Sequence, residues 1–407
     1  MIKLLEIENF KSLKKESFDF GKLNIITGVN SAGKSSVIQT LLLLADALSE
    51  CNSLDDKMRE DMRRRIDKES SILQMYLNKL VKFDAKNISE SQLKEKLAQQ
   101  LKRIDLIKQT IDEYKKTPNM LSIPNLKNWS FKIFRNRREN AKNIKIKLDN
   151  VICTIDPDSV RLENFNIGFK KDVDFFYLSE NRSGPENKEL FVESDEFGDR
   201  AEYVMGNFYR HQHEPIDDAL VVMDNMTLSG NVDYWMSKIL KSDEEDFSIG
   251  LKVEKNDSTS VRSSYDFCGL PGIEPLQLGA GVSYLAKMLI VCLCAKPGQI
   301  VIIENPEMHL HPRAQSAVGH FLSFIASKGI QVVIETHCEH LINKVQHDVF
   351  KGLLKPEDVF VYYKKSSMED FEKMTIGNSG HFYKNDERCF FPEGFFDATL
   401  EELMEIG

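Results

Sequence analysis

The stretch GVNSAGKSS, at residues 28–36, constrains this chain more than any other part of the sequence. Gly28 is followed five residues later by Gly33, Lys34 and Ser35, between a strand-like and a helix-like segment. In this context backbone N–H groups curl around phosphate oxygens, and the helix N-terminus adds a partial positive charge. Lys34 is then expected to reach the β- and γ-phosphates of ATP, and the Ser35 hydroxyl to coordinate Mg²⁺. The alternative is a glycine turn that precedes a helix by chance. The predicted nucleotide-binding residues of the loop are Gly28, Asn30, Ser31, Ala32, Gly33, Lys34, Ser35 and Ser36.

A second pattern, QIVIIENPE at residues 299–307, has an apolar strand that ends in a carboxylate. Glu304 at this strand end is expected to hold Mg²⁺ through water beside Ser35. Many strands end in glutamate, so this pattern is informative only together with the glycine loop. We therefore predict Ser35 and Glu304 as the metal-side residues.

The charge of the chain is unevenly distributed. The net charge is −9 at pH 7, yet residues 51–150 contain ten more basic than acidic residues. The segment is free of glycine and rich in helix-favouring residues, with Leu and Ile recurring every three or four positions from Leu93 to Ile111. We predict a basic helical hairpin arm over residues 51–149. Its charge favours DNA, RNA or another anionic partner, and a solvated hairpin that happens to be basic is an equal alternative.

The remainder is predicted to form one α/β head in two pieces, residues 1–50 and 150–407. Strands and helices alternate over residues 276–407, and nearly continuous apolar strands indicate a parallel sheet covered by helices on both faces. The N-terminal strands predict an additional antiparallel β subdomain. Residues 196–245 are predicted to form a helical subdomain of the head.

Composition bears on the compartment. No apolar run approaches the ~18 residues that a membrane span requires. The N-terminal stretch contains Glu6, Glu8 and Lys11, so it is predicted to be a strand rather than a signal peptide. Seven dispersed cysteines are typical of reduced thiols. We expect a cytoplasmic protein without a membrane partner.

Taken in order, the motifs resemble those of the SMC-type branch of the ABC ATPases. The stretches IENFKSL and LNIITGVNSAGKSS look like the N-terminus of that branch. LGAGVSYLAKML, VIIENPEMHLHP and VVIETHCEHL resemble its signature, its Walker B strand with D-loop, and its H-loop. PEMHLHP, FYLSENRSGP and FPEGFFD are closest to stand-alone bacterial ATPases related to the overcoming-lysogenization-defect (OLD-like) group, several of which serve in antiphage defence. The resemblance covers residues 1–50 and 150–407 and leaves out 51–149. It implies an ABC/SMC-type P-loop ATPase head.

The resemblance also implies a homodimer, or a higher oligomer, in which two heads sandwich two ATP molecules. Gly279, Gly281 and Ser283 match the signature, which would open a helix pointing at the partner's γ-phosphate, although this form departs from the commoner LSGGQ. His337 matches the histidine that senses the γ-phosphate. Arg182 resembles a position near the nucleotide, and a buried structural ion pair is an equal alternative.

Four further residues have weaker implications. Lys11 and Ser12 are candidates to approach the phosphates. His309 and His311 suggest a metal site with Glu307, but the resemblance assigns these alternate histidines to the D-loop.

The position that follows Glu304 predicts the rate of the reaction. Asn305 stands where the hydrolytic glutamate is usual, and an amide is not a general base near neutral pH. Glu307 is the next carboxylate along the chain. The predicted catalytic residues are Glu304, Asn305, Glu307 and His337, and the predicted hydrolysis is slow.

The resulting hypothesis is a dimeric, nucleotide-dependent switch of an antiphage defence system that acts with a nuclease or effector protein. An ATPase subunit of a transporter or of a DNA-repair complex is the alternative. A self-contained nuclease is disfavoured, because the sequence has no DxD-type acidic cluster after the head and no His-Asn-His pattern, and only some 70 residues follow His337.

Overall fold

A computed structural model describes residues 1–49, 141–157, 160–164, 173–241, 247–392 and 395, with the backbone of 120–123 and short pieces between 60 and 106. Most of the arm predicted over residues 51–149 lies outside the described residues.

The central sheet is formed mainly by parallel strands, as the apolar runs predict. Its order is β18-β17-β16-β15-β3-β14-β13-β8. The strands from β15 to β8 are parallel, and the three strands beyond β15 are antiparallel. Their bounds are β3 Leu23–Gly28, β8 Phe175–Leu178, β13 Ile300–Glu304, β14 Gln331–Glu335, β15 Val359–Lys364, β16 Glu372–Ile376, β17 Phe382–Lys384 and β18 Glu387–Cys389.

Both faces of this sheet are buried, since successive side chains of a strand point to opposite faces. On β14, Val332 and Ile334 face a core shared with α6, α7 and α8, whereas Val333 faces a second core shared with β1 and the helix at residues 34–49. This two-sided burial explains why these strands contain runs of consecutive apolar residues. The helix bounds are α6 Ala280–Cys294, α7 Pro312–Ser327 and α8 Glu339–Phe350.

A separate antiparallel sheet, in the order β2-β1-β5-β6-β7-β4, confirms the predicted β subdomain. Its strand β5, at residues 144–148, pairs with β1. The predicted boundary between arm and head at residue 150 therefore falls inside this sheet, because the sheet takes strands from both sides of it. The bounds are β1 Leu4–Phe10, β2 Leu13–Asp19, β4 Met120–Ile123, β5 Ile144–Leu148, β6 Val151–Ile155 and β7 Val160–Glu163.

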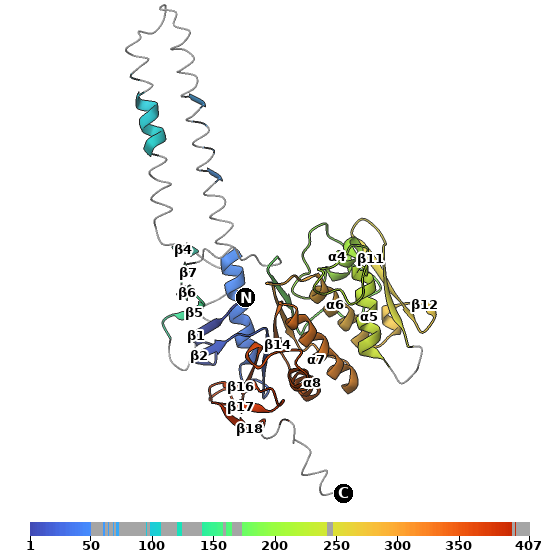
Figure 1. The fold of residues 1–407 in the computed structure, drawn as a ribbon. Helices are drawn as coiled ribbons and strands as arrows, with labels where there is room; N and C mark the ends of the chain where they lie inside the picture. Colours follow the sequence, from blue (N-terminus) through green and yellow to red (C-terminus); the bar gives the residue numbers. More distant parts are fainter. Residues whose placement is uncertain are drawn as a thin grey trace, which may run out of the picture.

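A smaller subdomain lies on the other side of the central sheet (Figure 1). Two helices, α4 and α5, fall within the predicted helical region of 196–245, and they pack on a small sheet in which β11 pairs with β9, β10 and β12. Trp235 of α5 is buried against Phe321 and Phe324 of α7, which joins the subdomain to the head. The bounds are α4 Val204–His211, α5 Leu228–Leu240, β9 Glu189–Leu190, β10 Ile249–Lys255, β11 Ser260–Phe267, β12 Leu270–Ile273, and the 3₁₀ turns η1 Pro275–Gln277 and η2 Pro356–Asp358.

Among the described residues, no helix combines the length and the apolar character needed to cross a bilayer.

Candidate functional site

The glycine loop and the predicted residues that follow the neighbouring strands meet at the carboxyl edge of the central sheet. The strands β3, β14, β13 and β8 are parallel neighbours, so the loops that follow them lie side by side. These loops carry the glycine stretch, His337, Asn305 and Arg182. A crevice at the carboxyl ends of parallel strands is where open α/β sheets bind ligands.

The first and last glycines of the loop are required by its backbone. Gly28 has φ 137°, and a Cβ there would lie 2.2 Å from the carbonyl oxygen of Lys364. Gly33 has φ 112°, and a Cβ there would lie 2.3 Å from the Ser12 hydroxyl. A larger residue at either position would push the loop away from strands that fix its shape.

Lys34 folds back over this loop. Its side chain is buried, with the residue 4% exposed, and Nζ donates a hydrogen bond of 2.8 Å to the Val29 carbonyl. Burial lowers the pKa of Lys34, and the nearby Glu335 carboxylate opposes that effect. A buried ammonium at the start of a helix suits a polyanionic ligand.

A residue that the sequence analysis did not single out, Glu335, completes this part of the site. The Ser35 hydroxyl donates a hydrogen bond of 3.0 Å to Glu335 Oε1. Glu335 ends β14 directly opposite Glu304, the end of β13. Burial, and after it the charge of Glu304, raises the pKa of Glu335 to about 7. The sequence contains a pattern that points to Glu335, since the apolar strand IQVVIE ends in glutamate as the strand IVIIE does.

This set of groups fits a magnesium ion. Among the described residues, Glu335 Oε2 is buried and has no hydrogen-bond partner, which leaves a carboxylate oxygen available to a cation. Mg²⁺ prefers oxygen ligands and is usually held by one or two carboxylates, with waters and substrate phosphates completing its shell. Ser35, Glu304 and Glu335 supply oxygen ligands of this kind.

Asn305 lies next to an exposed carboxylate. Its backbone has φ 45°, and its N–H donates to the Glu335 carbonyl at 2.8 Å. Its amide Nδ2 donates to Glu180 Oε2 at 3.4 Å. Glu180 follows β8, and its own N–H donates to Glu304 Oε2 at 3.0 Å. Glu180 therefore sits at the same edge as Glu304 and Glu335, although the sequence analysis did not select it.

Glu307 has a different environment from the one predicted. The residue is buried, and Oε1 accepts hydrogen bonds from Thr336 Oγ1 at 2.8 Å and from the His337 N–H at 3.3 Å. Burial raises the pKa of Glu307. These contacts orient the loop that carries His337. The His337 ring is exposed, and burial first and then the charge of Lys34 lower its pKa.

Arg182 makes the contacts of a structural clamp. Nη1 donates to the Glu304 carbonyl at 2.7 Å and to the Ser179 carbonyl at 3.1 Å, and Nη2 donates to the Asn305 carbonyl at 2.8 Å. Burial lowers the pKa of Arg182 to about 10. These three contacts are with backbone carbonyl groups rather than with the ion-pair partner considered as an alternative, and they fix the backbone at the end of β13.

The three signature residues are placed very differently. Gly279 caps α6, and a Cβ there would meet no atom within 4 Å. Gly281 packs on the D-loop, where a Cβ would lie 2.4 Å from the His309 carbonyl oxygen. Ser283 is 2% exposed and receives a hydrogen bond of 3.5 Å from the Tyr265 hydroxyl. Gly279 alone of the three is positioned to touch a second molecule.

Three of the four remaining candidates have partners within the chain, and the fourth, Ser12, lies close to the glycine loop. His309 stacks on Tyr284 with ring centroids 5.4 Å apart, and His311 caps α7 by accepting from the Arg313 N–H. Lys11 donates to Gln39 on the helix that follows the glycine loop. Ser12 lies behind Gly33, as the glycine's restricted space shows.

Comparison with known protein families gives two matches. Residues 155–343 match the family described as "AAA domain, putative AbiEii toxin, Type IV TA system". Residues 4–48 match a family described as "AAA domain".

Two curated proteins are similar over shorter stretches. An ATP/GTP phosphatase of Helicobacter pylori is 36% identical over 78 residues, which is 19% of this chain and 21% of that protein. The Old nuclease of Escherichia phage P2 is 27% identical over 103 residues, which is 23% of this chain and 18% of that protein. The matched stretches thus span about a fifth of the length of either relative.

Solved structures give weaker matches over most of the chain. An SMC head bound to the C-terminal winged-helix domain of ScpA has a TM-score of 0.40 at 12% identity, covering 92% of this chain and 98% of that one. The SMC head domain from Thermotoga maritima has a TM-score of 0.39 at 11% identity, covering 91% and 97%.

Proposed function

We propose that this chain, which is an SMC/OLD-like P-loop ATPase, binds ATP with Mg²⁺ and hydrolyses it slowly as a nucleotide-dependent switch. The observation that carries the proposal is the contact of Ser35 with Glu335 beside the buried Lys34. A glycine loop, a buried lysine and a hydroxyl next to carboxylates are the groups that hold a nucleoside triphosphate and its metal.

Each group has a distinct task in this proposal. The backbone N–H groups between Gly28 and Gly33 bind phosphate oxygens, and Lys34 exchanges its hydrogen bond with the Val29 carbonyl for one with the β- and γ-phosphates. Ser35, Glu304 and Glu335 hold Mg²⁺, which when bound neutralises charge that develops on the phosphates. His337 faces the γ-phosphate from the loop that Glu307 orients.

Slow hydrolysis is inferred from the residue that follows Glu304. The amide of Asn305 can orient a water molecule, but it cannot accept the proton of that water at neutral pH. Glu307 is buried and engaged with Thr336 and His337, so it does not replace the missing base. The exposed Glu180, 3.4 Å from the Asn305 amide, is the carboxylate best placed to receive the proton.

A dimer follows from the surface around Gly279. A cavity of about 350 Å³ lies there and is lined by Gly279, Lys241, Arg313 and His311. Basic side chains beside the open N-terminus of α6 suit the γ-phosphate of an ATP molecule held by a second copy of the chain. In this proposal the two copies bind head to head, and each completes the nucleotide site of the other.

The proposed cellular role is based on the descriptions of the matching proteins. One matching family is described as an AbiEii-type toxin of a toxin–antitoxin system, and one relative is a phage protein named Old nuclease. These descriptions support a switch in antiphage defence that acts with a nuclease or effector protein. Binding of nucleic acid by residues 51–149 stays a proposal based on their charge, since that segment lies mostly outside the described residues.

The test is calorimetric titration of ATP and Mg²⁺ into the full chain and into Lys34→Ala. We expect the variant to lose at least tenfold in affinity, because it lacks the only side-chain charge that approaches the β- and γ-phosphates from the loop. The matched control is Lys365→Ala, which removes an exposed lysine next to β15. Equal affinity in all three proteins would refute the proposal.

A further inference from the structure

A second cavity of about 350 Å³ lies at the other edge of the central sheet. Val173 and Phe176 line it from the start of β8, and Lys296 lines it from the loop that precedes β13. The nucleotide-site residues follow the carboxyl ends of these same strands. The cavity is therefore distinct from the nucleotide site, and its volume lies within the usual range for small-molecule sites.

The floor of this cavity is apolar. Phe176 and Phe197 meet edge to face with ring centroids 5.5 Å apart. Leu228 and Leu293 are buried beside them. Burial raises the pKa of the Cys294 thiol to about 12, so this side chain is also neutral. Such a floor accommodates the flat face of a ring better than a chain of polar groups.

One buried polar side chain in the cavity is not paired. Asn207 of α4 is 3% exposed and lines the cavity, and its side-chain amide has no hydrogen-bond partner among the described residues. By contrast, the buried amide of Asn231 donates to the Met226 and Thr227 carbonyls and accepts from the Val222 N–H. The Asn207 amide is thus available to a ligand.

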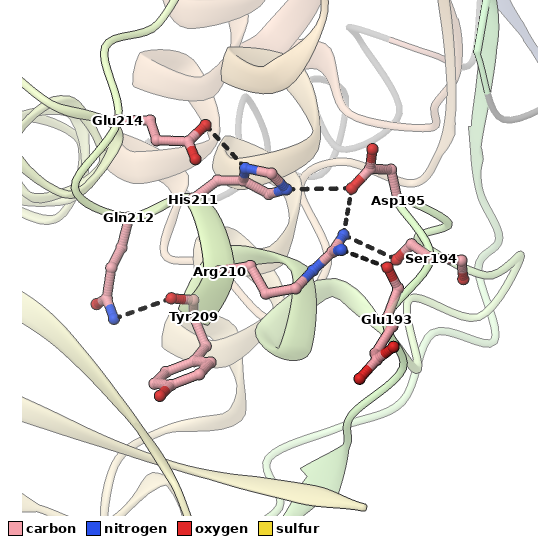
Figure 2. A network of polar contacts seen from close by, with 8 residues as sticks. All are labelled: Glu193, Ser194, Asp195, Tyr209, Arg210, His211, Gln212 and Glu214. Carbon is pink, nitrogen blue, oxygen red and sulfur yellow. Dashed lines mark hydrogen bonds and ion pairs between the residues drawn. The ribbon is translucent and has the colours of Figure 1, made fainter.

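The rim of the cavity is formed by a network of charged side chains (Figure 2). His211 lies between two carboxylates, with Nε2 3.1 Å from Asp195 Oδ1 and Nδ1 2.8 Å from Glu214 Oε2. Arg210 also contacts Asp195 and donates to the Ser194 carbonyl at 2.9 Å. Within the described part of the chain, Asp195 Oδ2 and Glu214 Oε1 have no partner.

The charges around the cavity determine which ligands can approach. Asp195, Glu214 and Asp217 line it with three carboxylates, against His211 and Lys296. The Asp195 side chain is 75% exposed and that of Glu214 is 61% exposed, so both can reach a ligand at the mouth. A surplus of carboxylates disfavours phosphate groups and favours hydroxyl or amine donors.

We propose that this cavity binds a nucleoside without phosphate groups. The Asn207 amide offers a donor and an acceptor side by side, which matches the edge of a nucleobase as asparagine does in pairing with adenine. The apolar floor receives the face of the base. The free oxygens of Asp195 and Glu214 accept hydrogen bonds from the sugar hydroxyls, as acidic side chains do for ribose in dinucleotide sites.

The experiment titrates adenosine, guanosine, cytidine and uridine separately into the full chain by calorimetry, with and without a saturating non-hydrolysable ATP analogue and Mg²⁺. The result expected is that at least one nucleoside binds under both conditions, because the two sites are separate. Its 5′-monophosphate should bind at least tenfold more weakly, since the rim repels phosphate.

Variants locate the binding. Asn207→Leu should weaken the nucleoside at least tenfold and leave the thermal midpoint unchanged or higher, because the lost amide has no partner in the protein. Asp195→Asn should weaken it less. The control Asn343→Leu changes an exposed asparagine of α8 and should have no effect.

Three results would overturn the proposal. The first is the absence of nucleoside binding at millimolar concentration, which would leave ordered water as the partner of Asn207. The second is displacement of the nucleoside by the ATP analogue, which would assign it to the nucleotide site. The third is unchanged binding in Asn207→Leu.

Discussion

The Ser35 hydroxyl lies 3.0 Å from Glu335, the last residue of β14, and the end of β13 at Glu304 is one strand further away. This relationship follows from the strand order, because β14 separates the glycine-loop strand β3 from β13. Glu304 and Glu335 therefore both lie on the metal side of the site. Glu335 is the nearer of the two to the glycine loop, and it ends β14, the strand that leads to His337.

The first prediction concerns this carboxylate pair. Glu335→Gln should weaken the Mg²⁺ dependence of ATP binding at least as strongly as Glu304→Gln, because Glu335 is the residue in contact with Ser35. Titration of Mg²⁺ at fixed ATP measures the effect. The exposed carboxylate at Glu254 of β10 provides a control, as Glu254→Gln. Loss of Mg²⁺ dependence in Glu304→Gln alone would show that Glu335 serves only to orient Ser35.

The second prediction concerns the proton acceptor. Removal of a general base typically costs on the order of 10²–10⁴-fold in rate, so Glu180→Gln should lower an already slow kcat by at least tenfold. Asn305→Glu should raise kcat, since it places a carboxylate beside the predicted water. Single-turnover hydrolysis measures both. Glu307→Gln should instead weaken nucleotide binding, because Glu307 orients the loop that carries His337. An unchanged kcat in Glu180→Gln would contradict the assignment of Glu180 as the proton acceptor.

How much of this site the sequence predicts depends on the range of the interactions. The glycine loop, the strand ends and the start of α7 at Pro312 follow from local rules, since proline is favoured at the first position of a helix. Each of these features depends on neighbouring residues in the chain.

Other features depend on contacts between distant segments. Ser35 and Glu335 are 300 positions apart, and their contact requires that β3 and β14 be neighbours. Gly281 suggested a ligand contact by its type, but it faces the His309 carbonyl oxygen. Ser283 matched the signature by position, yet it lies beneath Tyr265. No local pattern distinguishes a glycine that faces solvent from one that faces another backbone.

The third prediction concerns a buried ion pair that joins α6 to the start of β9. Lys287 Nζ is 2.5 Å from Glu189 Oε2 and donates to Ser183 Oγ at 2.7 Å. Burial raises the pKa of Glu189 to about 7, and Lys287 opposes it. Lys287→Met should destabilise the fold by about 3–5 kcal/mol at pH 8, because it leaves a buried carboxylate without its partner.

Urea denaturation measures this loss, and the double variant Lys287→Met with Glu189→Leu should recover part of it, since no uncompensated charge remains. Lys328→Met, a change at the end of α7, is the control. A double variant that is no more stable than Lys287→Met would show that packing, rather than charge, explains the loss.

The fourth prediction concerns pH. Burial raises the pKa of Asp233 to about 6 from an ordinary value of 3.8, although its carboxylate accepts from the Leu251 N–H at 2.8 Å. Because the folded-state pKa is the higher one, the stabilising contribution of this carboxyl is complete below pH 3.8 and is lost as pH rises through about 6. Asp233→Asn should therefore stabilise the fold by about 1–3 kcal/mol at pH 8 and by about half as much at pH 5. Urea midpoints at the two pH values test this, with exposed Asp218→Asn as control.

The last prediction tests whether two chains share each nucleotide site. A side chain at Gly279 meets no atom of its own chain, so Gly279→Glu should leave the fold intact while it blocks a partner's phosphate. Gly281→Ala should instead destabilise the fold, because its Cβ would meet the His309 carbonyl oxygen. Neither Gly279→Glu nor Lys34→Ala should hydrolyse ATP alone. A mixture of the two should recover about a quarter of the wild-type rate, since half of a random mixture is heterodimer and each heterodimer has one intact site in a twofold arrangement. Hydrolysis by Gly279→Glu alone at the wild-type rate would show that each head works without a partner.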